Sequence, residues 1–143
     1  MRKAKGKVGA TVGAAVLVAG TALSFSAATA SAEPAGQLVR YTLTSAAPYQ
    51  FQVLYLTAQP ASKDAYNDDA YAYVKRETIN VGPGAPWVVE TTLADPQWAI
   101  FQVSSTTKGS VGAPNARCEI AADGVVIAAQ DNPYSPLCQG AQW

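Results

Sequence analysis

The sequence predicts an all-β protein, an immunoglobulin-like antiparallel β-sandwich of about seven strands preceded by an N-terminal signal or anchor helix. Three observations predict this fold. After residue 37, short runs alternate between apolar and polar residues, turns rich in glycine and proline separate them, and none has helical periodicity. A small β-barrel is the alternative arrangement of the same strands.

Residues 1–32 have the features of a signal peptide. Four basic residues precede an uncharged apolar run from Val8 to Phe25, and Ala30-Ser31-Ala32 has the small-x-small form of a signal-peptidase site. Cleavage between Ala32 and Glu33 would release an exported protein. An uncleaved membrane anchor is the alternative, because the apolar run has about the minimum length that spans a bilayer.

The remaining residues suit one exported domain. Residues 33–143 contain six basic and ten acidic residues, a net charge of −4. This balance argues against nucleic acid as a partner, and a membrane contact is expected only if the N-terminal segment is retained. We expect a short tether at residues 33–37, a β-sandwich domain at residues 38–143, and a secreted, periplasmic or cell-envelope location.

The first half of the domain contains four predicted strands. Gln50 and Gln52 are expected to face outward in the second strand. Lys75-Arg76-Glu77 suits the third to an edge or exposed position, where charge blocks unwanted pairing. Residues 58–69 between the second and third strands are predicted to be a loop. The four strands are Leu38–Thr44, Tyr49–Thr57, Tyr71–Ile79 and Trp87–Leu93.

Three further strands follow, at Gln97–Ser105, Cys118–Ala122 and Val125–Ala129. Asp123-Gly124 separates the last two and tolerates the positive φ angles of a type I′ hairpin turn. Pro133 and Pro136 then end the regular pairing, because proline lacks a backbone donor.

The two cysteines, Cys118 and Cys138, allow one intramolecular pairing. We expect a disulfide that ties the C-terminal end back to the preceding hairpin, rather than the inter-sheet bridge of antibody domains. Its loop would contribute about 3 kcal/mol to stability. Two free buried thiols are the alternative, and an oxidising compartment favours the disulfide.

No reaction is predicted, and no cofactor. The chain has no histidine, which excludes Ser-His-Asp and Cys-His arrangements, and its cysteines are not in a C-x-x-C motif. Glu77, Glu90 and Glu119 lie on predicted strands, but no spacing brings two of them together as glycosidases require. Four oxygen-bearing residues in one loop suggest a cation site, although a solvated acidic loop is the preferred interpretation; they are Asp64, Asn67, Asp68 and Asp69.

The aromatic residues fall into two groups. One group occupies core positions of alternating strands and is expected to pack there: Tyr41, Tyr55, Trp87 and Phe101. The other lies outside these positions and could form a contact surface for a protein or a glycolipid: Tyr66, Tyr71, Tyr73, Tyr134 and Trp143.

Five motifs occur in order along the domain: Val39-x-Tyr41-x-Leu43-Thr44, Val53-x-Tyr55, Ala85-Pro86-Trp87, Cys118-x-Ile120-x-x-Asp123-Gly124 and the late Cys138. Together they resemble the periplasmic domain of the MmpS family of mycobacteria and related actinobacteria. The resemblance implies a β-sandwich accessory protein without catalytic residues, which assists MmpL transporters of the RND type in exporting lipids or siderophores. It also implies that Cys118 and Cys138 are the family's disulfide.

Two functions therefore compete. One is an accessory or interaction domain of the cell envelope, with an MmpL-type transporter or another envelope protein as partner. The other is a secreted binding module for a small apolar ligand, held in a cavity between the sheets that aromatic residues line.

Overall fold

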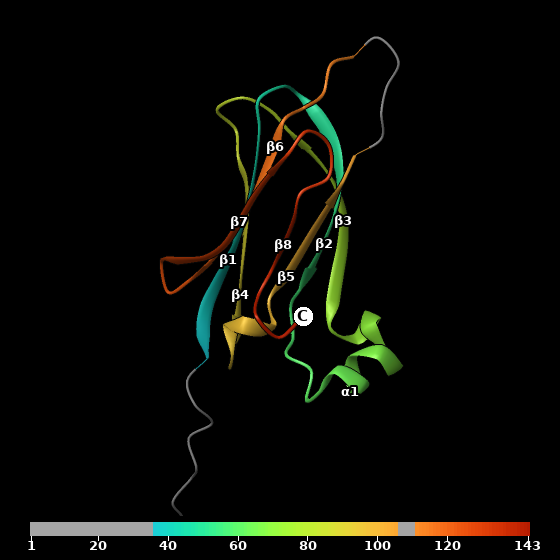
Figure 1. Ribbon diagram of the computed structural model, residues 1–143, viewed down its shortest axis with the longest axis vertical. Helices are drawn as coiled ribbons and strands as arrows, with labels where there is room; N and C mark the ends of the chain where they lie inside the picture. The colour runs from blue at the N-terminus through green and yellow to red at the C-terminus, as the bar shows by residue number, and fades with distance from the viewer. Residues whose placement is uncertain (1–35, 106–110) are drawn as a thin grey trace, which may run out of the picture. The chain divides into compact units, whose positions relative to one another are not determined.

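Two antiparallel sheets of four strands each pack face to face (Figure 1). The computed structural model describes residues 36–105 and 111–143, so the predicted signal peptide and its cleavage site lie outside the described residues. Sheet A has the order β4 (Trp87–Leu93), β1 (Gln37–Ser45), β6 (Ala116–Ala122) and β7 (Val125–Asn132). Sheet B has the order β3 (Val74–Val81), β2 (Tyr49–Leu56), β5 (Ile100–Ser104) and β8 (Leu137–Gln139).

The predicted antiparallel β-sandwich is confirmed, with eight strands in the described residues where about seven were expected. The additional strand is β8, whose three residues pair with β5. Three residues are too few for an alternating pattern to show in the sequence. The strand is recognised only by its pairing with β5, which is distant in the sequence. As predicted, β3 is an edge strand.

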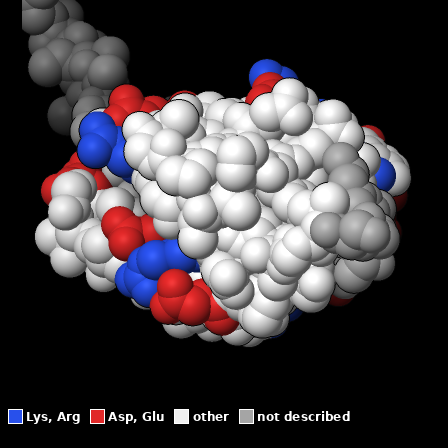
Figure 2. All heavy atoms as spheres, turned by 90° about the horizontal axis from the view of Figure 1, so that it is seen from above, with Lys and Arg blue, Asp and Glu red and all other residues white. Residues whose placement is uncertain are grey.

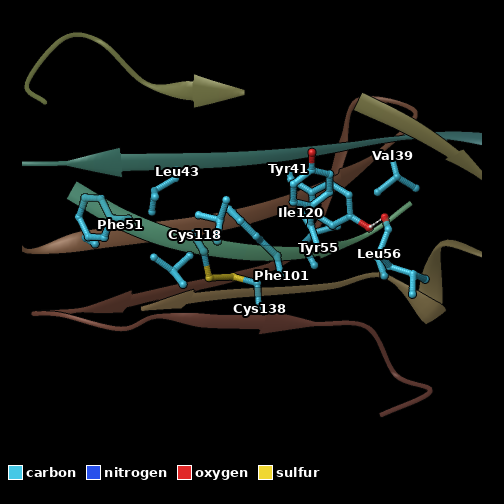
Figure 3. Close-up of a cluster of buried hydrophobic side chains, with 14 of the residues drawn as sticks. Val39, Tyr41, Leu43, Phe51, Tyr55, Leu56, Phe101, Cys118, Ile120 and Cys138 are labelled. Carbon is cyan, nitrogen blue, oxygen red and sulfur yellow. Dashed lines mark hydrogen bonds between the residues drawn. A yellow bond between two sulfur atoms is a disulfide. The ribbon is translucent and has the colours of Figure 1, made fainter. Parts of the chain in front are cut away.

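The space between the sheets is filled by aromatic rings from both of them (Figure 3). The alternation in β1 and β2 carries Tyr41 and Tyr55 inward, and their ring centroids lie 5.5 Å apart. Phe101 lies 5.5 Å from Tyr41, and Trp87 lies 5.7 Å from Phe101. Burying each such side chain contributes about 1.5–3 kcal/mol. Because these rings pack against one another, they give no support to the prediction of an apolar ligand cavity between the sheets.

A buried hydrogen bond also joins the sheets. The Tyr41 hydroxyl donates to the Leu56 carbonyl oxygen at 2.7 Å, so a side chain of sheet A satisfies the backbone of sheet B. Burial, with a smaller contribution from Tyr55, raises the pKa of Tyr41 well above its usual value. The phenol in the folded protein therefore keeps its proton to a higher pH than an exposed tyrosine does.

The disulfide between Cys118 and Cys138 is an inter-sheet bridge. Cys118 lies on β6 of sheet A and Cys138 on β8 of sheet B, with the two Cα atoms 6.0 Å apart (Figure 3). The expectation that it would not join the sheets was wrong, because β8 was not recognised: Cys138 pairs with Phe101 on β5. The bridge therefore clamps the two layers directly.

The hairpin of β6 and β7 turns as expected. Asp123 and Gly124 have φ angles of 47° and 83°, as a type I′ turn requires. β7 continues beyond the predicted end, to Asn132, and Pro133 then stops the pairing. The carboxylate of Asp123 accepts a hydrogen bond from the Leu38 N–H at 2.9 Å, so the turn is fastened to the start of β1.

Residues 58–69 are not a plain loop. They contain a short helix, α1 (Lys63–Asp68), which is capped because the Ser62 hydroxyl accepts a hydrogen bond from the Ala65 N–H at 3.1 Å. Two 3₁₀ helices, η1 (Ala70–Ala72) and η2 (Pro96–Trp98), delay the starts of β3 and β5 by three residues each. Six residues are too few for helical periodicity to show in the sequence.

Candidate functional site

The outer face of sheet B carries a continuous set of amide and hydroxyl side chains. Alternation along β2 turns Gln50, Gln52 and Leu54 away from the core. Residues opposite one another in an antiparallel pair share a face, so the register assigns five more side chains to this surface. They are Arg76, Thr78 and Asn80 on β3, and Gln102 and Ser104 on β5.

Three shallow hollows follow β2 across this face. The first, of about 420 Å³, is lined by Pro48, Tyr49, Gln50, Asn80, Val81 and Gly82. The second, of about 250 Å³, is lined by Gln50, Phe51, Gln52, Thr78, Ser104 and Ser105. The third, of about 40 Å³, is lined by Gln52, Val53, Leu54, Arg76, Gln102 and Ser104. Neighbouring hollows share residues, so together they form one groove, called here the β2 groove.

The β2 groove opens at the end of the sandwich that Figure 2 views. The four turns described there, residues 46–48, 82–86, 111–115 and 133–136, contain no charged residue. Charged side chains lie around the rim of this view, most densely at the left and lower left, and the middle of the view is white. The surface that leads into the groove is therefore neutral in the described residues.

Several polar side chains of the β2 groove have no partner among the described residues. Among the described residues, no hydrogen bond or ion pair engages the side chains of Gln50, Gln52 or Gln102. The same holds for the guanidinium group of Arg76, although Lys75 beside it pairs with Glu77. The donors and acceptors of these four side chains are therefore available to solvent or to a ligand.

An aromatic cluster, formed by Tyr66, Tyr73, Trp98 and Trp143, lies at the opposite end of sheet B. Trp143 is its centre: its ring lies 4.7 Å from Tyr66 and 5.6 Å from Trp98, both edge to face. The Trp143 indole N–H donates to the Trp98 carbonyl oxygen at 2.7 Å. The cluster forms because α1, η2 and the C-terminus meet at this end (Figure 1).

The structure brings together three of the five aromatic residues predicted as a contact surface. Tyr66, Tyr73 and Trp143 come together in the aromatic cluster, where all three are half-buried. Tyr71 is 76% exposed and contacts no other ring in the described residues. Tyr134 follows β7 at the other end of the sandwich, where its carbonyl oxygen accepts a hydrogen bond from Ser105. Trp98 was assigned to a strand and missed.

Apart from Tyr41, the shifted pKa values in the described residues belong to one cluster, formed by Lys75 and Glu77 on β3 and Tyr55 on β2. Lys75 pairs with Glu77, and this hydrogen bond raises the pKa of Lys75 and lowers that of Glu77. The Tyr55 hydroxyl donates to Glu77 at 3.2 Å, while burial raises the pKa of Tyr55. Each group is held in its usual charge state at neutral pH, which is not the condition of a poised acid or base.

The carboxylates considered for catalysis do not converge. Glu77 lies in sheet B, whereas Glu90 and Glu119 lie in sheet A on strands that β1 separates. Each has a basic neighbour within ion-pair distance: Lys75, Arg40 and Arg117, respectively. Within the described residues no three acidic or cysteine side chains are grouped to hold a metal ion, and Asp64, Asp68 and Asp69 are exposed on or beside α1.

The architecture agrees with a known domain family. A sequence model described as the Rv2576c beta-sandwich domain matches residues 41–138, well over half of the chain. The chain belongs to this family. Uncharacterized proteins from Mycobacterium tuberculosis (Rv2576c and MT2652) and Mycobacterium bovis (Mb2606c) are each 36% identical over 132 residues, covering 91% of this chain and 84% of theirs. No solved structure matches the chain.

This membership corrects the resemblance to the MmpS family. The match is to the Rv2576c domain, and no match to MmpS accompanies it. The motifs that suggested MmpS are an alternating strand, an Asp-Gly turn and two late cysteines, which many disulfide-linked sandwiches can share. The role beside an MmpL transporter therefore loses its support. No helix in the described part of the chain has the length and apolar character needed to cross a bilayer.

Proposed function

We propose that the chain is an exported, non-catalytic binding domain of the cell envelope. The observation that carries this proposal is the β2 groove, an open surface on which the amides of Gln50, Gln52 and Gln102 have no partner among the described residues. The groove lies on a sheet whose other face is a filled aromatic core, so its side chains are presented by a rigid support. A preformed surface of this kind suits binding without a large ordering cost.

Export is supported by two independent features. Residues 1–32 have the charge, apolar run and small residues of a signal peptide. The disulfide between Cys118 and Cys138 joins the two sheets, and such bonds persist in oxidising compartments rather than in the cytosol.

A non-catalytic role is supported by the dispersal of reactive groups. The chain contains no histidine, and both cysteines form the disulfide. Glu77, Glu90 and Glu119 lie on three separate strands, and each has a basic neighbour. The β2 groove itself contains amides, hydroxyls and one arginine. These groups bind and orient ligands, but none is a general base near neutral pH.

The export part is tested by the mass of the protein recovered from the producing cells. Cleavage predicts a chain that begins at Glu33 and has no titratable thiol before reduction. A chain that retains residues 1–32 in the cytosolic fraction, with two free thiols, would overturn export.

The binding part is tested by sedimentation with washed envelope fragments. We expect the purified mature protein to pellet with the fragments in a saturable manner, and an unrelated exported protein of similar size and charge to stay in solution. Absence of saturable binding would contradict the proposed function.

A further inference from the structure

We propose that the β2 groove binds a neutral polysaccharide chain. This inference rests on the proposed binding function and names the ligand class of the same site. Three properties of the groove carry it: the chemistry of its side chains, its charge, and its shape.

The side chains of the groove match an array of hydroxyl groups. A side-chain amide offers two donors and a carbonyl acceptor, while a hydroxyl offers one donor and two lone pairs. Gln50, Gln52 and Gln102 present three amides. Thr78 and Ser104, which lie on either side of Gln52, add two hydroxyls. Groups that donate and accept at once pair with neighbouring sugar hydroxyls, which also do both.

The charge of the groove favours a neutral polymer over a polyanion or a polycation. Among the described residues, no carboxylate lines the three hollows, and Arg76 is the single charged residue of their lining. Tight binding of a polyanion needs several cations, and a cationic ligand needs carboxylates. A neutral polyhydroxylated chain requires neither, and one guanidinium group can donate several hydrogen bonds to it.

The shape of the groove favours a chain over a small molecule. Pockets for small ligands are concave, largely apolar and enclose most of the ligand surface. The β2 groove is instead shallow and open, its lining is about as polar as it is apolar, and it extends along β2 from Pro48 to Leu54. At about 3.3 Å per residue this is on the order of 20 Å, the length of several linked sugar rings.

A protein partner fits the groove less well. The centres of protein interfaces are enriched in aromatic side chains, methionine and arginine and depleted of small polar residues. The centre of this groove is Gln52 with Thr78 and Ser104, and the exposed aromatic residues lie elsewhere. A protein is therefore retained as an outcome of the test rather than as the proposal.

The test is native affinity electrophoresis of the mature protein in gels that contain glycogen, mannan or galactan. At least one of these neutral polysaccharides is expected to retard the protein, and hyaluronate, a polyanion, is not. The double variant Gln52→Ala/Gln102→Ala should raise the dissociation constant about tenfold or more, because hydrogen-bonding amides are lost. Matched controls on sheet A, Gln37→Ala and Thr44→Ala, should leave it unchanged.

Two results would overturn the inference. One is the absence of retardation by all three neutral polysaccharides, or retardation by hyaluronate alone with loss in Arg76→Ala. The other is retardation that Gln52→Ala/Gln102→Ala leaves intact. Each variant's unfolding midpoint is measured first, and we expect it to stay at the wild-type value because neither amide is used within the fold.

Envelope sedimentation separates this inference from the proposed function. If the wild-type protein pellets with protease-treated envelopes and the neutral polysaccharide competes, both stand. If it pellets only with untreated envelopes and Gln52→Ala/Gln102→Ala pellets equally, the partner is a protein and only the polysaccharide inference fails. If it does not pellet at all, the envelope function fails, and the gels still decide whether the groove binds a neutral polysaccharide.

Discussion

The outer faces of the two sheets differ in how their polar side chains are used. On sheet A, Arg40 pairs with Glu90 at 2.6 Å, and Arg117 pairs with Asp131 at 2.7 Å. On sheet B, the amides of Gln52 and Gln102 have no partner among the described residues. A ligand on sheet A would have to compete with existing ion pairs, whereas a ligand on sheet B would displace only water. Sheet B is therefore the face on which we expect binding.

The largest expected effect on stability comes from removing the disulfide that joins the two sheets. Replacing the disulfide in Cys118→Ala/Cys138→Ala should lower the free energy of unfolding by about 3 kcal/mol, because a closed loop of 20 residues is released in the unfolded chain. Denaturant unfolding measures the loss, and the wild-type protein under a reducing agent is the control. A change below about 1 kcal/mol would mean that the bridge contributes little to holding the sheets together.

A second effect appears at high pH. Because the folded state keeps the pKa of Tyr41 above its unfolded value, stability from this group is full below about pH 10 and falls as the pH rises further. The expected slope is up to about 1.4 kcal/mol per pH unit. Tyr55, whose pKa is also raised, adds to the same loss.

The free energy of unfolding between pH 8 and 12 checks this slope, together with absorbance of the tyrosinate. In Tyr41→Phe the slope should become shallower. An equal slope in both proteins would show that the Tyr41 phenol ionises as readily in the folded state as in the unfolded chain.

At neutral pH the same substitution tests the hydrogen bond between the sheets. Tyr41→Phe leaves the Leu56 carbonyl oxygen without its 2.7 Å donor while keeping the ring in the core. We expect a loss of about 1–2 kcal/mol, as for a buried acceptor left unpaired. Tyr71→Phe, on an exposed tyrosine, is the matched control and should change stability by less than about 0.5 kcal/mol.

The smallest effect addresses the comparison of the faces themselves. Exposed ion pairs contribute about 0–1 kcal/mol, so Arg40→Ala should cost a few tenths of a kcal/mol and lose that cost at high salt. Gln52→Ala should cost nothing measurable at either salt concentration. A double-mutant cycle on Arg40 and Glu90 isolates the pair, and a coupling of zero would remove the distinction between the faces in stability.

Much of the fold could be predicted because it is local. The alternation of Val39, Tyr41 and Leu43 marks a strand with one buried face. Asp123-Gly124 supplies the positive φ angles of the turn between β6 and β7 without help from the rest of the chain. The edge position of β3 also follows from its own charges. Such features depend on residues a few positions apart.

What could not be predicted depends on distant pairing. β8 has three residues and exists because β5 pairs with it, so the inter-sheet position of Cys138 was missed with it. α1 is too short for a periodic signal. The outward orientation of Gln52 was predicted, but its position beside Ser104 depends on the register between β2 and β5. The groove is therefore a property of the pairing rather than of any one segment.

The most direct test of the central claim is a nuclear magnetic resonance titration with an oligosaccharide cut from the polysaccharide that retards the protein. We predict that the side-chain amide signals of Gln50, Gln52 and Gln102 shift together on addition. The backbone amides of Arg40 and Glu90, on the other sheet, should not move. Shifts confined to sheet A or to the ring signals of Trp143, with the three glutamine amides unmoved, would contradict the account.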